Sequence, residues 1–263
     1  MIQLENVSVK YRDTVALHPL SLNINEGQFT VLLGSSGAGK STFLRCLNLM
    51  NHLDSGCVRV SGFSGNWNRQ MLQRLRRETG MIFQQHQLIA KQTALQNVLM
   101  GRLGYHSVFR SLFPLPKTEQ ELGLQSLKRV GLLDKALCRV DQLSGGQQQR
   151  VGIARVLVQQ PRTILADEPV ASLDPATAGE VLNLIYSISR ENNISAVVSL
   201  HQVDLARKYA DRIIGLAGGR VVFDGRPEEL TPAKVDELYR SRHSGRETKV
   251  PGRLLNLPFP LAS

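Results

Sequence analysis

The stretch Gly34-Ser-Ser-Gly-Ala-Gly-Lys40-Ser41-Thr42 decides the fold. It follows an apolar run at residues 29–33 and precedes a segment of helical periodicity that runs to about Met50. This is the pattern G-x-x-x-x-G-K-[ST] in the strand-to-helix context that it requires. Its glycines let backbone N–H groups point at a phosphate, and a helix N-terminus adds a favourable dipole. The sequence therefore predicts a phosphate-binding loop, the P-loop, rather than an ordinary glycine-rich turn.

The side chains of this loop suit a nucleoside triphosphate with a divalent metal. Lys40 is expected to reach the β- and γ-phosphates, and Ser41 to ligate Mg²⁺. The expected ligands are thus a nucleoside triphosphate and Mg²⁺. The other nucleotide contacts predicted in the loop are Gly34, Ser35, Ser36, Gly37, Ala38, Gly39 and Thr42.

A second apolar run, residues 163–166, ends in the acidic pair Asp167 and Glu168. Ligands of an open α/β sheet bind beyond the carboxyl ends of its strands, so these carboxylates belong near the phosphates. Asp167 is predicted to hold Mg²⁺ or its waters, and Glu168 to polarise the attacking water. The alternative, a solvated acidic turn, is a weak one beside a P-loop.

The remaining periodicity predicts an α/β fold: a P-loop NTPase core with a mainly parallel sheet, an antiparallel β edge and an inserted all-helical subdomain. Runs that are apolar on both faces indicate covered parallel strands, whereas alternating runs indicate edge or antiparallel strands. Runs that are apolar on both faces occur at residues 80–83, 196–200 and 212–216. Alternating runs occur at residues 2–9 and 15–24. Helical periodicity dominates residues 93–100, 119–130 and 147–158. We expect one domain over residues 1–240, with its helical subdomain at about 88–160, and a basic, loosely packed tail over 241–263.

Composition narrows the classes of partner. The net charge of +10 and the pI of about 9.9 favour anionic surfaces. Aromatic residues make up only 5% and do not alternate with basic ones, which argues against stacking on single-stranded nucleic acid. The first ten residues have no apolar signal segment, and no stretch approaches the roughly 18 apolar residues of a membrane helix. We expect a soluble chain that has no nucleic-acid partner and acts at a membrane only through another protein.

A second glycine-containing turn carries a family resemblance. Leu143-Ser-Gly-Gly-Gln147, continued by Gln-Gln-Arg150, stands shortly before Asp167 and resembles the signature motif of ABC ATPases. Further features lie where that family has them: Tyr11 for the aromatic that stacks on adenine, Gln84 for the glutamine linking core and helical subdomain, Asp174 in Ser172-Leu-Asp174 for the D-loop, and His201 for the switch histidine.

The resemblance implies an ATP hydrolase that energises transport. Glu168, His201, Gln84 and Lys40 are then the catalytic residues, and Ser41, Gln84 and Asp167 the metal ligands. It also implies a head-to-tail homodimer, in which the signature turn and the D-loop of one subunit close over the ATP of the other. The additional nucleotide contacts would be Tyr11, Ser144, Gly145, Gly146, Gln147 and Asp174. From its residues alone, the Ser144 turn fits either an anion cradle or a helix cap.

Within ABC ATPases the chain is similar to the phosphonate-import ATPases of bacteria. The resemblance lies in Gly80-Met-Ile-Phe-Gln-Gln85, residues 97–104, an insertion at 107–113 and Leu200-His-Gln-Val-Asp204. It implies import of phosphonates or a related phosphorus oxyanion, with an integral membrane permease and a solute-binding protein. The ATPase would lie peripherally on the cytoplasmic face of the inner membrane.

Other functions remain open because an ATPase subunit does not touch the cargo. The first alternative is an importer of another small solute. A DNA-repair or chromosome-organising ABC ATPase would usually carry a coiled coil or a zinc insertion, and this sequence has neither heptads nor cysteine clusters. A translation-associated ABC protein would normally carry two such domains in one chain.

The permease is predicted to contact the surface between residues 84 and 113. Gln84 is expected at the γ-phosphate, so this segment can respond both to the nucleotide and to a partner. Its apolar residues Val108, Phe109, Leu112 and Phe113 are predicted to receive a cytoplasmic permease helix. The alternative is that they cap the helical subdomain.

Overall fold

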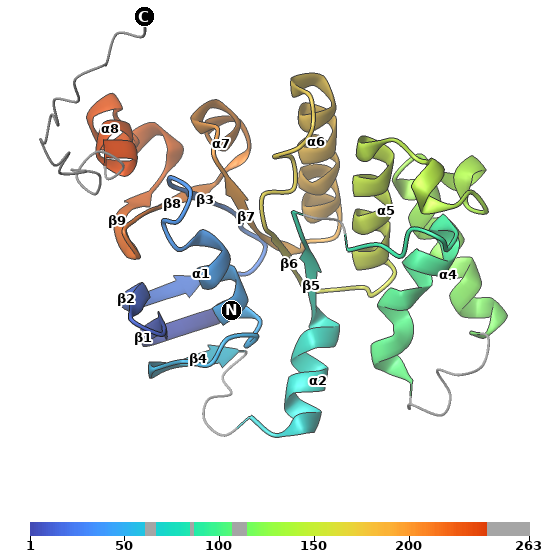
Figure 1. Cartoon of the computed structure of the whole chain (residues 1–263), viewed down its shortest axis with the longest axis horizontal. Coiled ribbons are helices and arrows are strands. Elements are labelled where there is room, and N and C mark those ends of the chain that lie inside the picture. Colours follow the sequence, from blue (N-terminus) through green and yellow to red (C-terminus); the bar gives the residue numbers. More distant parts are fainter. Residues whose placement is uncertain (61–66, 85–86, 107–114, 241–263) are drawn as a thin grey trace, which may run out of the picture.

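The computed structural model describes residues 1–60, 67–84, 87–106 and 115–240, and its strands form two sheets (Figure 1). The larger sheet has the order β5-β6-β7-β3-β8-β9, in which β9 alone is antiparallel to its neighbour. Its strands are β3 (Phe29–Leu33), β5 (Thr79–Ile82), β6 (Thr163–Ala166), β7 (Ser195–Leu200), β8 (Arg212–Ala217) and β9 (Arg220–Gly225). The smaller, antiparallel sheet has the order β2-β1-β4, with β1 (Ile2–Tyr11), β2 (Thr14–Ile24) and β4 (Ser55–Val60).

The central strand β3 is buried at every position because the sheet is covered on both faces. Phe29, Val31 and Leu33 point into one apolar core, and Leu32 into the other. A strand with two buried faces needs no alternation of polar and apolar residues, which explains the unbroken apolar run in the sequence.

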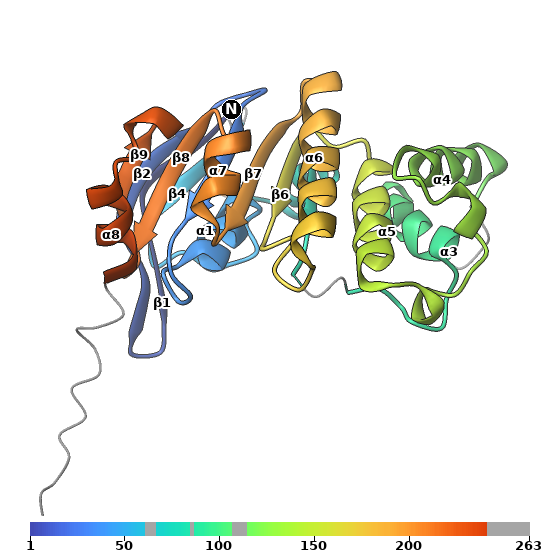
Figure 2. The same ribbon diagram turned by 90° about the horizontal axis from the view of Figure 1, so that it is seen from above.

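Helices cover both faces of the larger sheet and extend beyond one of its edges (Figures 1 and 2). The α-helices are α1 (Lys40–Leu47), α2 (Arg69–Glu78), α3 (Ala94–Leu99), α4 (Lys117–Arg129), α5 (Gly145–Leu157), α6 (Pro175–Glu191), α7 (Val203–Tyr209) and α8 (Pro232–Arg240). The short 3-10 helices are η1 (Met100–Tyr105), η3 (Leu133–Lys135), η4 (Val140–Gln142) and η5 (Pro227–Glu229). The smaller sheet and α1 share one core, whereas α3 to α8 contribute to the other. In both views α3, α4 and α5 gather at one end of the molecule, beyond α6.

The predicted fold class is confirmed, with several differences in detail. The helix after the P-loop ends at Leu47 rather than near Met50, because Leu49 adopts a left-handed φ of 48°. The sequence analysis did not predict α2, β4 or β9. Each of the three elements buries a single residue, so its apolar periodicity is weak. The domain limits near residues 88, 160 and 240 stay predictions.

Candidate nucleotide site

The P-loop joins β3 to α1 with a backbone that requires glycine. Gly34 has a φ of 155°, and a Cβ added there would lie 2.3 Å from the carbonyl oxygen of Leu216. Gly37 has a φ of 81° with no heavy atom within 4 Å of such a Cβ. At Gly34 the packing excludes a side chain, whereas at Gly37 only the backbone conformation favours glycine. The loop therefore leaves open space at Gly37 while it packs tightly against β8.

Lys40 lies at the centre of this site although it is 4% exposed. Its Nζ donates hydrogen bonds to the carbonyl oxygens of Gly34 at 2.9 Å and Ser35 at 3.1 Å. The same Nζ lies 3.4 Å from Glu168 Oε1 and 3.5 Å from His201 Nδ1. A desolvated cation of this kind is a strong electrostatic partner for phosphate oxygens. The structure thus brings together three of the predicted catalytic residues.

Glu168 and His201 are in direct contact. Glu168 Oε1 lies 2.6 Å from His201 Nε2. The backbone of Glu168 adopts a left-handed φ of 47°. For a residue other than glycine, such a backbone is uncommon and costs free energy, so it persists only where the surrounding structure enforces it. Here the Glu168 amide donates to Ser199 Oγ at 2.8 Å. The turn therefore fixes the Glu168 carboxylate beside the P-loop, where a general base needs to be.

Asp167 is buried and accepts hydrogen bonds from Ser41 Oγ and Ser199 Oγ, each at 3.0 Å. The Ser41 hydroxyl and the Asp167 carboxylate are hard oxygen donors, and Mg²⁺ is commonly held by one or two such groups together with substrate phosphates. Among the described residues there is no group of three His, Cys, Asp or Glu side chains that could hold a metal without the nucleotide. The donor set at Ser41 and Asp167 therefore fits Mg²⁺ in a nucleotide complex.

Gln84 lies at the same edge of the sheet. Ile82 pairs with Ala166 in the parallel ladder, so Gln84 follows β5 at the level where Glu168 follows β6. Its side chain is exposed and makes no hydrogen bond within the described part of the chain. The position agrees with a residue near the γ-phosphate, and its catalytic and metal-binding roles stay predictions.

Tyr11 ends β1 and is 46% exposed. Ala16, on the neighbouring β2, places its carbonyl oxygen so close to the P-loop that a Cβ on Gly39 would lie 2.8 Å from it. The start of β2, close to the turn that follows Tyr11, therefore adjoins the phosphate loop. An exposed aromatic ring here is available to stack on a base, and this role of Tyr11 also stays a prediction.

The signature turn begins α5 with a reciprocal cap. Ser144 Oγ accepts from the Gln147 amide at 3.3 Å, and Gln147 Oε1 accepts from the Ser144 amide at 3.0 Å. Such a capping box stabilises a helix N-terminus. Ser144 and Gly145 are exposed, so the N-terminal end of the helix dipole faces outward. The sequence leaves two interpretations of this turn open, a helix cap and an anion cradle. The geometry is compatible with both roles in the same turn.

The D-loop residue Asp174 lies beside this turn. Its Oδ1 caps α6 by accepting from the amides of Ala176 at 3.1 Å and Thr177 at 3.0 Å. Hydrogen bonds from the side chain and then the backbone of Thr177 hold the pKa of Asp174 below its ordinary value. A Cβ on Gly146 would lie 2.7 Å from Thr177 Cγ2, so the two motifs are packed together.

The signature turn and the P-loop do not meet within one chain. In Figures 1 and 2, α5 lies on the opposite side of α6 from α1. The structure therefore brings together Lys40, Ser41, Asp167, Glu168 and His201, and separately Ser144 to Gln147 with Asp174. The signature turn is exposed, is suited to an anion, and lies away from the P-loop of its own chain. A turn that contributes to the nucleotide site of a neighbouring subunit needs these properties.

Ser199 is a site residue that the sequence analysis missed. Its hydroxyl donates to Asp167 Oδ1 and accepts from the Glu168 amide, so it orients both carboxylate residues. It belongs to β7, which neighbours β6 in the sheet, with Val198 paired to Ala166. A lone serine within an apolar run gives no signal for this role, and only the strand order reveals it.

Replacing Ser199 with alanine is expected to slow hydrolysis and weaken the fold. Losing both hydrogen bonds next to a buried carboxylate should lower the free energy of unfolding by about 1–3 kcal/mol. Misplacement of the acids should lower turnover at least about tenfold. Ser195→Ala is the matched control, because Ser195 Oγ accepts from the Gly27 amide at the other end of β7. Denaturant unfolding and ATPase rates measure the two effects, and equal turnover in both variants would contradict the assignment.

Similarity to known proteins extends over nearly the whole chain. A family profile described as ABC transporter matches residues 17–171. A phosphonates import ATP-binding protein, PhnC 3, of Nostoc sp. is 54% identical over 100% of this chain and 99% of that protein. PhnC 1 of Trichodesmium erythraeum is 58% identical over 92% of this chain and 96% of that protein. A phosphite import ATP-binding protein, PxtA, of Stutzerimonas stutzeri is 53% identical over 95% of this chain and 91% of that protein.

Solved structures show the same architecture. A dimeric bacterial ABC transporter cassette has a TM-score of 0.77 at 34% identity, covering 86% of this chain and 99% of that one. A second structure of that cassette, in a post-hydrolysis state bound to ADP and Pi, has a TM-score of 0.74 over the same coverage. Within the described residues of this chain, no helix has the length and apolarity needed to span a bilayer.

Proposed function

Because the chain belongs to the ABC transporter ATPase family, we propose that it is the ATP-hydrolysing subunit of an importer for phosphonates or a related phosphorus oxyanion. The observation that carries this proposal is the meeting of Lys40, Glu168 and His201 at a P-loop whose Ser41 contacts Asp167. This arrangement supplies phosphate binding, a general base and hard oxygen ligands in one place. The cargo is supported by the names of the relatives, which import phosphonates or phosphite.

Each residue of the site has a distinct task in this reaction. Lys40 would neutralise the oxygens of the β- and γ-phosphates, where negative charge develops. Glu168 would orient and deprotonate the attacking water, with His201 holding its carboxylate and contacting the γ-phosphate. Ser41 and Asp167 would hold Mg²⁺, with Gln84 as a further ligand, and the metal would supply charge neutralisation at the phosphates. These roles agree with the geometry and are tested by the variants below.

We further propose that two copies of the chain assemble head to tail on ATP. The dimeric form of the related cassette supports this assembly, and so does the outward-facing turn at Ser144. Each ATP would then lie between the P-loop of one subunit and the signature turn of the other, with Asp174 close by. The dimer would act peripherally at the cytoplasmic face of the inner membrane, with a permease and a solute-binding protein.

The variant Gly145→Asp tests the contribution across the dimer. Among the described residues outside its own helix, a Cβ at Gly145 would have one heavy atom within 4 Å, Leu173 Cδ2 at 3.9 Å, so the chain itself accommodates the new side chain. The added carboxylate would repel the triphosphate of the partner subunit. We expect the affinity of the monomer for ATP to change little while turnover collapses, whereas the control Gly145→Ala stays active.

Mixing Gly145→Asp chains with Lys40→Ala chains should restore part of the ATPase activity. One site of the mixed dimer then pairs an intact P-loop with an intact signature turn. An inactive mixture in which mixed dimers are demonstrably present would argue against contribution in trans.

A transport assay tests the cargo. The purified subunit would be reconstituted with the permease and the solute-binding protein of the importer, and uptake of several phosphonates, phosphite and phosphate compared. We expect uptake of at least one of these oxyanions to require both ATP and this subunit. Uptake of an unrelated small solute alone would support the alternative importer function. Retention of the subunit on DNA or ribosomes, without membrane subunits, would support the nucleic-acid alternative.

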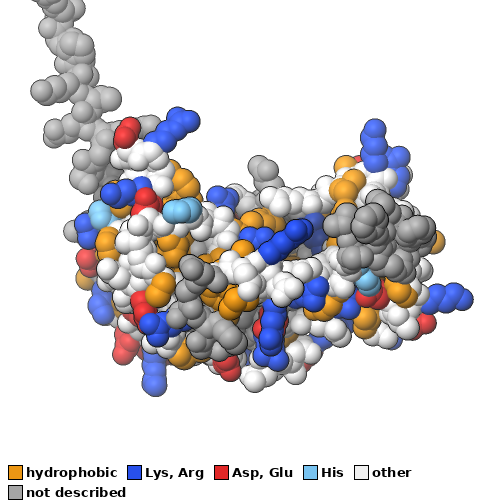
Figure 3. Space-filling view, turned by 90° about the horizontal axis from the view of Figure 1, so that it is seen from below, with side chains coloured by type: hydrophobic (Ala, Val, Ile, Leu, Met, Phe, Trp, Pro, Cys, Tyr) orange, Lys and Arg blue, Asp and Glu red, His pale blue; other side chains and the backbone are white. Residues whose placement is uncertain are grey.

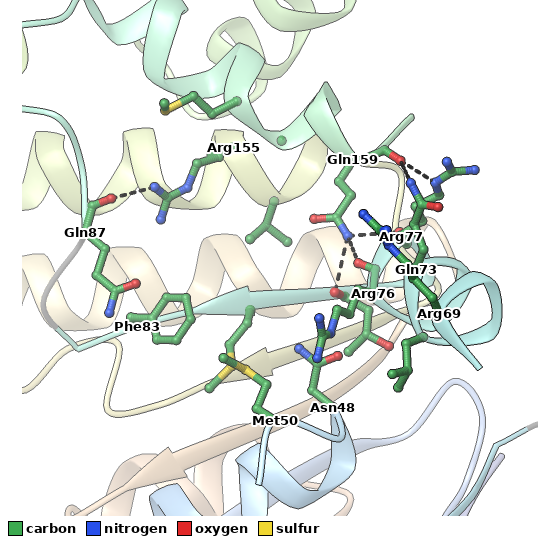
Figure 4. Close-up of a pocket in the computed structure, with 17 residues that line it drawn as sticks. Asn48, Met50, Arg69, Gln73, Arg76, Arg77, Phe83, Gln87, Arg155 and Gln159 are labelled. Carbon is green, nitrogen blue, oxygen red and sulfur yellow. Dashed lines mark hydrogen bonds between the residues drawn. The ribbon is translucent and has the colours of Figure 1, made fainter. Parts of the chain in front are cut away.

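The permease contact is predicted on the surface between residues 84 and 113. Its apolar residues Val108, Phe109, Leu112 and Phe113 lie outside the described residues, as does the predicted tail at 241–263. The described part of the segment, however, borders a groove that is lined by Gln87, Met100, Gly101 and Gly104 together with residues of α2 and α5 (Figure 4). Seen from the side of α2, basic and hydrophobic side chains lie next to one another over the middle of the molecule (Figure 3). We propose that this groove belongs to the permease contact.

A further inference from the structure

His201 lies in a turn between β7 and α7 that neither element fixes. β7 ends at Leu200, and the bonding of α7 begins at Gln202, whose carbonyl oxygen accepts from the Ala206 amide. Gln202 is the N-cap of this helix, and its side chain makes no capping hydrogen bond. The backbone of His201 therefore needs a partner from elsewhere in the chain to hold it in one conformation.

Packing restricts the ring of His201 only in part. The side chain is 38% exposed, although Nε2 lies 2.6 Å from Glu168 Oε1. On its other side, Nδ1 lies 3.5 Å from Lys40 Nζ. The rotamers open to a side chain depend on its backbone dihedrals, so the direction of this exposed ring is set by the turn that carries it.

Tyr239, on the C-terminal helix α8, supplies the missing partner. Its hydroxyl donates to the His201 carbonyl oxygen at 2.8 Å. Burial raises the pKa of Tyr239 from its ordinary value, so the phenol keeps its proton and stays a donor at neutral pH and above it. The two residues are 38 positions apart in the sequence, and no sequence motif predicts their contact.

The helix that carries Tyr239 is firmly attached to the sheet. Leu238 is fully buried, and a Cβ on Gly215 of β8 would lie 2.5 Å from Leu238 Cδ2, so α8 packs directly against this strand. Arg207 of α7 donates to the Leu230 carbonyl oxygen, shortly before α8, at 2.8 Å. Both helices lie toward the β9 end of the larger sheet, away from α3 and α4 (Figure 2). The Tyr239 hydroxyl therefore contacts the turn from a fixed support.

Two different elements thus hold Glu168 and His201. Ser199 of β7 accepts from the Glu168 amide, and Tyr239 of α8 donates to the His201 carbonyl oxygen. Each contact acts on the backbone, so neither supporting residue has to touch the nucleotide to affect hydrolysis. Displacement of a reacting group by about 1 Å can cost on the order of a hundredfold in rate.

We infer that Tyr239 is a positioning residue for ATP hydrolysis, because its hydroxyl holds the His201 backbone so that the ring meets Glu168 and faces the γ-phosphate. This inference rests on the proposed function and adds a residue that lies outside the nucleotide site. Without the hydroxyl, His201 keeps its place in the chain but turns more freely, and the arrangement that supports hydrolysis is reached less often. ATP binding by the P-loop does not depend on this contact.

The test compares Tyr239→Phe with Tyr105→Phe in the full-length chain. Phenylalanine keeps the ring and removes only the hydroxyl group. Tyr105 is the matched control, because its hydroxyl also donates to a backbone carbonyl oxygen, that of Gln159, at 2.8 Å. We expect kcat for ATP to fall at least about fivefold in Tyr239→Phe with KM within a factor of about two, and little change in Tyr105→Phe. Equal kcat values in the two variants would overturn the inference.

A double-mutant cycle with His201→Ala shows whether Tyr239 acts through the histidine. Once the imidazole is absent, removing the Tyr239 hydroxyl should lower turnover by less than about twofold. An undiminished loss in this background would overturn the inference. The NMR signal of the His201 imidazole, identified by its absence from His201→Ala, gives a readout that needs no turnover. It should move in Tyr239→Phe and stay in place in Tyr105→Phe, and an unmoved signal in Tyr239→Phe would also overturn the inference.

Restoring a donor at position 239 should restore the rate. 4-Aminophenylalanine carries N–H groups where tyrosine has its hydroxyl, so it should recover most of the lost turnover, and a folded chain without recovery would overturn the inference. If the unmodified chain does not hydrolyse ATP, the proposed function fails. If it does and Tyr239→Phe hydrolyses ATP equally well, only this inference fails. A Tyr239→Phe chain that does not fold would show that the hydroxyl serves the fold rather than the histidine, which would overturn it too.

Discussion

Replacing Lys40 with alanine is expected to abolish ATP hydrolysis, with a loss of turnover of at least about a hundredfold. Among the contacts described, the Lys40 ammonium is the cation closest to Glu168 and His201. Its side chain is nearly fully buried. A buried charge of this kind stabilises developing phosphate charge far more than an exposed one. Alanine removes it, and the glycines that shape the loop stay in place.

Steady-state ATPase rates measure the effect, and thermal unfolding shows whether the variant remains folded. Lys128→Ala is the matched control, because Lys128 is an exposed lysine near the end of α4. Turnover of Lys40→Ala within a factor of about two of the unmodified protein would falsify the assignment. A variant that is folded, binds ATP more weakly and does not hydrolyse it is the expected outcome.

Short contiguous motifs made the core of the site predictable from the sequence. The P-loop pattern needs glycines, a lysine and a hydroxyl residue within one turn, and in the structure Lys40 contacts the Gly34 carbonyl while Ser41 contacts Asp167. The acidic pair was found because Asp167 and Glu168 directly follow a buried strand. In each case the chemistry and the local backbone are encoded by neighbouring residues.

Features that depend on the order of strands or on distant helices could not be predicted in this way. Ser199 contacts both acids because β7 lies beside β6, and nothing in the sequence states that order. The groove lined by Arg69, Arg76 and Arg155 joins α2, η1 and α5, which are far apart along the chain. Its main wall, α2, buries only Leu75, so its periodicity gave little indication that it packs there.

Replacing Glu168 with glutamine is expected to stop hydrolysis while ATP binding is retained. The amide keeps the shape of the side chain and its ability to hydrogen bond, but it is not a base and cannot deprotonate water. Loss of a general base typically costs about 10²–10⁴-fold in rate. Removing the negative charge beside Lys40 should also leave that ammonium freer to bind the γ-phosphate. Glu180→Gln, an exposed change on α6, is the control for loss of a carboxylate.

The same variant should accumulate as a dimer in the presence of ATP. Hydrolysis is what removes the γ-phosphate that both subunits would contact, so a subunit that binds ATP without cleaving it keeps the paired state. Size-exclusion chromatography with ATP and Mg²⁺ should show Glu168→Gln as a dimer, and Lys40→Ala and the double variant Glu168→Gln/Gly145→Asp as monomers. If Glu168→Gln elutes only as a monomer while it still binds ATP, then either Glu168 is not the base or the subunits do not pair across the nucleotide. The ATPase rate of Glu168→Gln separates these explanations, because continued hydrolysis would mean that Glu168 is not the base, whereas lost hydrolysis without a dimer would mean that the subunits do not pair across the nucleotide.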